Sequence, residues 1–153
     1  IKDAKVIELN DGRCIYNFYT DMPIGDAYDI ENKIGSLIDN LSLRLKKKQI
    51  IKKKKFKLPR RLRSFTTATK VNFLADEIHN RTVLEMISID RPGLLVEVSE
   101  VFRRNNIWIE SAKIATIGER AEDVFYLRNE YQDAIALEIT KKLGSELVES
   151  LDS

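Results

Sequence analysis

The stretch that decides the fold is Thr82-Val-Leu-Glu-Met-Ile-Ser-Ile-Asp-Arg-Pro-Gly-Leu-Leu95. Its first eight residues alternate between two faces, which predicts a strand. Asp90 to Gly93 then interrupt the alternation, and Pro92 suits the first turn of a helix. Gly93 lacks a Cβ, so a ligand or another backbone can approach it closely. The apolar residues that follow recur at helical spacing: Leu94, Leu95, Val98, Val101 and Phe102. We therefore predict a strand that passes through a tight turn directly into a helix.

The sequence on either side of this stretch completes an α+β pattern. Alternating apolar residues predict further strands at 70–76, 107–117 and 121–127, with a chain turn at 118–120. Apolar residues at helical spacing predict a closing helix from Ile135. The order strand–strand–helix–strand–strand–helix predicts an antiparallel sheet with helices on one face, an α+β sandwich.

The first part of the chain repeats half of this pattern. Residues 2–9 and 13–20 read as a hairpin, and an amphipathic helix follows from Ala27. Repetition of one unit predicts tandem domains of one type. We expect a partial first domain over residues 1–48 that lacks its opening strand and helix, a basic linker over 49–68, and a second domain over 69–153. Because the chain opens directly on strand-like sequence, we also expect it to be part of a longer protein.

Residue counts exclude several kinds of active site. A single cysteine, Cys14, and a single histidine, His79, leave no Cys-rich zinc site, no histidine metal triad and no Ser–His relay. The lone cysteine is compatible with a reducing compartment, which predicts a cytoplasmic location. No run approaches eighteen apolar residues, so no membrane-spanning helix is expected. No catalytic or metal-binding residue is predicted in this chain.

Basic residues are concentrated in one segment. Residues 44–63 contain twelve Lys or Arg and no acidic residue, although the whole chain has a net charge of only +2. Such a segment can bind nucleic acid or a membrane surface, or it can be a solvated connector. Phe56 is its only aromatic residue, which gives no stacking platform for single-stranded nucleic acid. We predict a connector and not a nucleic-acid or membrane contact, and the sequence leaves its partner open.

Two stretches carry a family resemblance. The strand, Asp-Arg-Pro-Gly-Leu-Leu and the helix resemble the opening of an ACT domain, a βαββαβ ferredoxin-like module that senses amino acids. Residues 107–127, Ile-Trp-Ile-Glu-Ser-Ala-Lys-Ile-Ala-Thr-Ile-Gly-Glu-Arg-Ala-Glu-Asp-Val-Phe-Tyr-Leu, resemble the last ACT repeat of the PII uridylyltransferase/uridylyl-removing family. The resemblance covers essentially the whole chain and is weakest over the first hairpin. It implies tandem ACT domains at the C-terminus of such an enzyme.

The resemblance also implies a role and partners. An amino-acid effector, glutamine, would shift the balance between opposed activities on the PII protein. Those activities belong to upstream catalytic domains of the same chain, which use a divalent metal, so no cofactor is expected here. The resemblance further admits a dimer formed through ACT domains.

The ligand-binding residues that the resemblance implies fall into two groups: Asp90, Pro92, Gly93 and Leu94 in the turn, and Glu110 and Ser111 in the next strand. The ligand carboxylate would meet the backbone amides around Gly93 and Leu94. The other end of the ligand would face Glu110 and Ser111, on this repeat or on a paired one. In the first repeat, Asp3 and Ala4 hold the corresponding strand position.

Structural interpretations stay open beside these functional ones. The turn can serve only to join strand and helix, in a module that associates with other domains and binds no small molecule. Glu110 and Ser111 can belong to a plain exposed strand edge. For Trp108 we predict a packing role, and for His79 a place in a turn.

Overall fold

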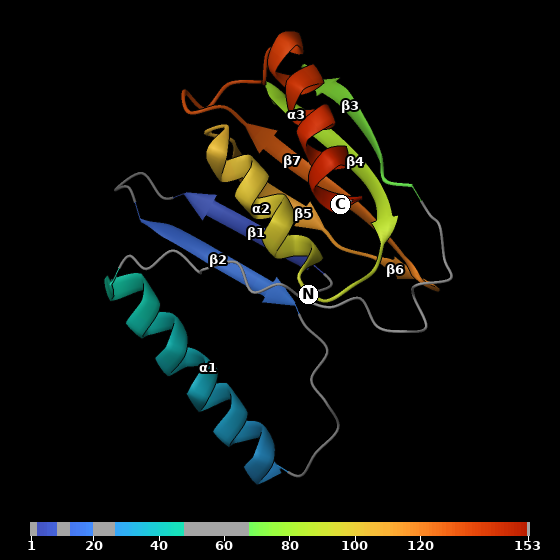
Figure 1. Ribbon diagram of the computed structural model, residues 1–153. Helices are drawn as coiled ribbons and strands as arrows, with labels where there is room; N and C mark the ends of the chain where they lie inside the picture. The colour runs from blue at the N-terminus through green and yellow to red at the C-terminus, as the bar shows by residue number, and fades with distance from the viewer. Residues whose placement is uncertain (1–2, 9–12, 20–26, 48–67, 153) are drawn as a thin grey trace. The chain divides into compact units, whose positions relative to one another are not determined.

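The computed structural model describes residues 3–8, 13–19, 27–47 and 68–152 (Figure 1). Contacts divide the chain into two compact units, one of residues 1–20 and 55–153 and the other of residues 21–54. The residues that join the two strands of the first hairpin, those that lead from it to the helix at Ala27, and most of the basic linker lie outside the described residues.

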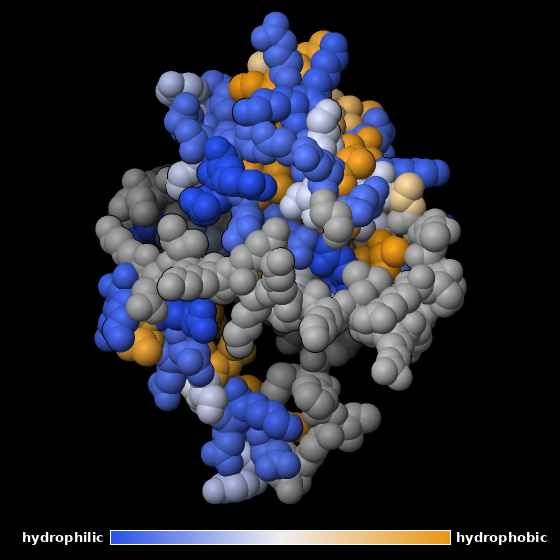
Figure 2. All heavy atoms as spheres, viewed as in Figure 1, coloured by the Kyte–Doolittle hydropathy of each residue, from blue (hydrophilic) through white to orange (hydrophobic). Residues whose placement is uncertain are grey.

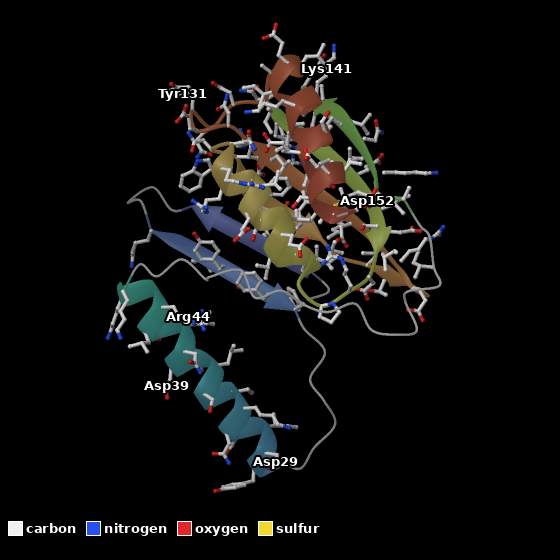
Figure 3. All side chains as sticks on the ribbon, viewed as in Figure 1. Asp29, Asp39, Arg44, Tyr131, Lys141 and Asp152 are labelled. Atoms are coloured by element: carbon white, nitrogen blue, oxygen red, sulfur yellow. The ribbon has the colours of Figure 1, made fainter. Side chains whose placement is uncertain are left out.

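The smaller unit is described by one helix, α1 (Ala27–Lys47). Asp29 lies in its first turn, and Arg44, Lys46 and Lys47 lie in its last turn (Figure 3). Acidic residues at the N-terminus and basic residues at the C-terminus both stabilise a helix through its dipole. An exposed apolar stripe runs along it at spacings of three and four residues: Ile34, Leu37, Ile38 and Leu41. The amphipathic helix predicted from Ala27 is confirmed.

The larger unit is built on one antiparallel sheet. Its strands are β1 (Asp3–Glu8), β2 (Cys14–Tyr19), β3 (Lys70–Asp76), β4 (Arg81–Ile89), β5 (Trp108–Lys113), β6 (Thr116–Ile117) and β7 (Arg120–Arg128). Their order is β2-β1-β5-β7-β4-β3, and the short β6 pairs with β7. Helices α2 (Leu94–Arg104) and α3 (Leu137–Leu151) pack together on one face of this sheet (Figure 1). The predicted α+β class with helices on one face is confirmed.

The second repeat has the strand–strand–helix–strand–strand–helix order that the sequence predicts. The place beside β4 is filled by β3, which precedes it along the chain, whereas a βαββαβ module fills its sheet with a strand that follows the second helix. Asp152, at the end of α3, accepts hydrogen bonds from the N–H and Oγ1 of Thr69 (Figure 3). The start of β3 is thereby tied to the end of α3.

The first hairpin extends the sheet of the second repeat. β1 pairs with β5 through Asp3–Lys113, Ala4–Ala112 and Lys5–Ser111. Strand β5 is therefore an inner strand with neighbours on both sides. Of the two residues for which a plain exposed strand edge was an open alternative, Ser111 pairs with Lys5 of β1, and this pairing ends there, before Glu110.

The core lies between the sheet and the two helices. Alternate residues of β4 and β7 face it, and Phe102 meets Phe125 edge to face with ring centroids 5.4 Å apart. The largest fully buried side chains also include Leu84, Met86, Leu127, Leu143 and Leu147. The alternation predicted for β4 is confirmed. Trp108, in contrast, is 56% exposed, so the predicted packing role is wrong.

Truncation of the core should separate buried from exposed positions on the same hairpin. Leu84→Ala removes a side chain that is 0% exposed, and we expect it to lower the free energy of unfolding by about 2–5 kcal/mol. Leu74→Ala on β3, where the side chain is 47% exposed, should change it by less than about 1 kcal/mol. Urea unfolding followed by circular dichroism measures both. Equal effects would contradict the assignment of the two faces.

Candidate functional site

The turn between β4 and α2 is held by backbone hydrogen bonds. The N–H of Asp90 donates to the carbonyl of Glu119 at 3.0 Å, and that of Leu94 donates to the carbonyl of Arg91 at 3.1 Å. Gly93 has φ 90° and ψ −4°, a left-handed conformation that side chains disfavour. Its carbonyl accepts the N–H of Glu97, the first hydrogen bond of α2. The predicted passage from strand through turn to helix is confirmed.

The start of α2 offers hydrogen-bond donors to an anion. The structure shows no acceptor, among the described residues, for the backbone N–H groups of Gly93, Leu95 and Val96. The N–H of Leu94, which the sequence analysis included, is already used within the turn. Unpaired N–H groups and the positive end of the helix dipole together favour a carboxylate.

Arg91 stabilises the turn through bonds to both helices. Its Nη1 donates to Oε1 of Glu97 at 3.0 Å and its Nη2 to Oε2 at 2.8 Å, and Nη2 also reaches the carbonyl of Leu151 at 3.3 Å. Both side chains of this ion pair are largely buried. The pair links the turn to the first turn of α2 and to the end of α3. The pattern of the sequence predicts no role for the side chains of Arg91 and Glu97.

Loss of this ion pair should loosen the turn. Arg91→Ala leaves the carboxylate of Glu97 largely buried without its bidentate partner, and we expect a loss of about 2–4 kcal/mol in the free energy of unfolding. Arg120→Ala is the matched control, because its ion pair with Glu122 lies at the surface, and its loss should be below about 1 kcal/mol. Thermal unfolding of both variants tests this difference. A loss for Arg91→Ala no larger than for the control would contradict the role of Arg91.

Asp123 is a buried acid beside the turn. It pairs with Met86 across the β4–β7 ladder, and its side chain is 1% exposed on the helix-covered face. Oδ1 accepts the N–H of Ala115 at 3.3 Å, whereas Oδ2 has no hydrogen-bond partner. Burial raises the pKa of Asp123 to about 6; the Ala115 N–H opposes this rise and the charge of Asp90 adds to it. The sequence analysis quoted Asp123 only within the family resemblance, although its alternation with Ala121 and Phe125 places it on the inner face.

The strand predicted over residues 107–117 is broken where Asp90 and Asp123 converge. It consists of β5 and β6, with Ile114 and Ala115 between them. Thr116 donates from Oγ1 to Oδ2 of Asp90 at 3.2 Å, one residue after the N–H that Asp123 accepts. The turn predicted at 118–120 is confirmed, with Gly118 at φ 64°.

Protonation of Asp123 should make stability depend on pH. The folded-state pKa lies above the unfolded value of 3.8, so the folded state holds this proton more tightly between pH 3.8 and about 6. Stability from this group is full below pH 3.8 and falls as pH rises toward 6, by up to about 3 kcal/mol. We expect the unfolding free energy of wild type minus that of Asp123→Asn to fall by this amount between pH 4 and 7. Urea unfolding at several pH values measures it, and a difference that does not change with pH contradicts the burial of an ionisable Asp123.

Glu110, another predicted site residue, lies in a charge network on the open face of the sheet. Glu110 sits at a bulge in β5, and its two oxygens accept Nη1 of Arg81 and Nε of Arg128, each at 2.8 Å. Arg81 also donates to Asp76 and lies 4.3 Å from the centre of the Tyr126 ring. Arg81, with a smaller effect from His79, lowers the pKa of Asp76 to about 2. A ligand at Glu110 would have to compete with two arginines.

The two predicted halves of the site lie at opposite ends of the sheet. Ser111 pairs with Tyr126, which pairs with Val83, seven residues before Asp90 on an extended strand. At about 3.3 Å per residue the separation is roughly 20 Å along the strand. Within this chain the structure therefore brings Asp90, Pro92, Gly93 and Leu94 together, and it does not bring Glu110 and Ser111 to them. That these two residues of a paired repeat face the turn stays a prediction. His79 lies in the turn between β3 and β4, as predicted.

Other candidate surfaces were also compared with the turn. A shallow groove between β3 and α3 has a volume of about 660 Å³ and is lined in part by Val71, Phe73 and Gly144. Among the residues that are coloured in Figure 2, hydrophilic and apolar ones are interspersed. Among the described residues, no three His, Cys, Asp or Glu side chains lie together as a metal site. No helix in the described ranges has the length and apolar character needed to cross a bilayer.

Comparison with known proteins identifies the class. Residues 82–145 match the family model of the ACT domain. This range begins in β4, contains the turn, α2 and β5 to β7, and ends within α3. Residues 82–145 therefore belong to an ACT domain.

The chain as a whole is similar to the C-terminal region of bifunctional uridylyltransferase/uridylyl-removing enzymes. It is 31% identical to that of Idiomarina loihiensis and 35% to that of Vibrio parahaemolyticus, each over 99% of the chain, and 34% to that of Photobacterium profundum over 97%. The chain spans about 17% of the length of each of these relatives. No solved structure matches it significantly. The resemblance predicted from residues 82–127 is confirmed.

Proposed function

We propose that this chain is the amino-acid-sensing regulatory module of a bifunctional uridylyltransferase/uridylyl-removing enzyme, with glutamine as its effector. The observation that carries the proposal is the turn at Asp90–Gly93, which presents unpaired N–H groups at the start of α2 within an ACT domain. The similarity to the named relatives supports the choice of parent enzyme.

The turn suits the carboxylate end of an amino acid. The N–H groups of Gly93, Leu95 and Val96 supply donors, and the absence of a Cβ on Gly93 allows close approach. A ligand bound here would favour one arrangement of the parent enzyme only if it binds that arrangement more tightly. The upstream catalytic domains, and through them the PII protein, are the proposed targets of this shift.

A second function is favoured by the internal bonds of the turn. The Arg91–Glu97 ion pair and the hydrogen bond from Asp90 to Glu119 hold the turn without any ligand. The module would then serve only in association, either with the upstream domains or in a dimer of ACT domains. The pairing of β1 with β5 supports this second function, because it joins the first hairpin to the sheet edge to edge.

Calorimetry separates the two functions. We expect L-glutamine to bind the 153-residue chain with measurable heat and to raise its melting temperature at millimolar concentration, and L-asparagine to bind more weakly. Gly93→Ala should weaken glutamine binding, because a Cβ at φ 90° strains the turn.

The matched control for this test is Gly35→Ala on α1, where an added Cβ meets open space. It should leave glutamine binding unchanged. Absence of heat and of any thermal shift with every amino acid tested would favour the association function instead.

A further inference from the structure

Oδ2 of Asp123 is the one buried side-chain oxygen or nitrogen without a hydrogen-bond partner in the part of the chain that the structure describes. Buried polar atoms are nearly always paired, so an unpaired carboxylate oxygen requires an explanation. Ionised, it is costly in an apolar surrounding unless a cation or a donor meets it. No Lys, Arg or His among the described residues forms an ion pair with Asp123. A cation from outside these residues would both neutralise this carboxylate and supply the donor that Oδ2 lacks.

The position of Asp123 connects it to the proposed ligand site. It lies on the helix-covered face, three ladder positions from the end of β4, where the chain turns into α2. The charge of Asp90 acts on it, and the adjoining residues Ala115 and Thr116 bond to Asp123 and Asp90 respectively. Asp90 thus begins the turn that leads to the unpaired N–H groups of α2, and Asp123 lies three ladder positions from that end of β4.

We propose that Asp123, together with Asp90, binds the α-ammonium group of the amino acid whose carboxylate is held at the start of α2. This inference rests on the proposed function and names the part of the site that recognises the ligand's positive charge. Charge-assisted hydrogen bonds to a buried carboxylate are stronger than neutral ones. Donors at α2 and acceptors at the two aspartates would select a zwitterion over a simple carboxylic acid or amine.

The route to Asp123 passes through an exposed hydrogen bond. Oδ2 of Asp123 is covered in the ligand-free chain, and Asp90 and Thr116 bond to each other at the surface beside it. The entering ammonium group replaces the Thr116 hydroxyl as the donor to Asp90. It then contributes the donor that Oδ2 of Asp123 lacks.

Calorimetry with two ligands and two variants tests this role. The ligands are L-glutamine and 4-carbamoylbutanoate, which is glutamine without its amino group. Asp123→Asn keeps the shape of the side chain and removes its charge, and we expect it to weaken L-glutamine binding about 10- to 100-fold. Binding of 4-carbamoylbutanoate, already weaker to the wild type, should change less than about twofold.

Glu122→Gln is the matched control, because it removes a neighbouring negative charge that pairs with Arg120 on the open face of the sheet. It should leave both affinities within about twofold of wild type. Asp90→Asn, at an exposed position, is a second variant that does not threaten folding and should weaken L-glutamine more than 4-carbamoylbutanoate. Amide NMR spectra of each variant check that the fold is retained.

The outcomes distinguish this inference from the proposed function. If wild type binds L-glutamine and both aspartate variants bind it equally well, the role of the two aspartates is overturned and the sensing function stands. Equal affinity of wild type for L-glutamine and 4-carbamoylbutanoate would also overturn the role of the two aspartates and leave the sensing function standing. If wild type binds no amino acid, the sensing function is overturned and the inference with it.

Discussion

The backbone ladder between β4 and β7 is the constraint on which the rest of the structure depends. It runs without a shift from Thr82–Leu127 to Ile89–Arg120, so it fixes which residues share a face and an end of the sheet. It places Asp123 beside Met86 in the core and ends where Asp90 begins the turn. The same register holds Glu110 and Ser111 near Arg81 and Val83, far from the turn. A slip of one residue would turn Asp123 out of the core and remove the arrangement beside α2.

Stability and binding make opposite demands at this end of the sheet. Arg91 and Glu97 satisfy each other and hold the turn, which any strand-to-helix connection requires. Asp123, in contrast, is not satisfied by its neighbours: burial raises its pKa to about 6, and one of its oxygens lacks a hydrogen-bond partner. Departures from full polar satisfaction are expected where a protein binds something. The contrast between these two acids, one paired and one unpaired, is what directs attention to Asp123.

Local patterns in the sequence predicted the local structure. Apolar residues alternate along β4 and recur at helical spacing after Gly93. Both patterns predicted the observed strand and helix, because each arises from burial of one face. Pairings between distant segments could not be predicted this way: β1 joins β5 across about a hundred residues. Trp108 was predicted to pack since Trp is usually buried, but its strand position leaves it exposed. The turn at Asp90–Leu94 and the pair Glu110 and Ser111 were placed in one site only by the family resemblance. In this chain they lie roughly 20 Å apart along the strands.

The most direct test of the account is amide NMR mapping of L-glutamine on the uniformly labelled chain, because the two ends of the sheet give separate signals. The account predicts that shifts concentrate at residues 90–97, 114–116 and 121–123, around the turn, the strand break and Asp123. Signals around Glu110, Arg81 and Arg128 should stay nearly unchanged. Shifts concentrated at that opposite end, or no shifts at saturating glutamine, would contradict the central claim that this turn is where the module senses its ligand.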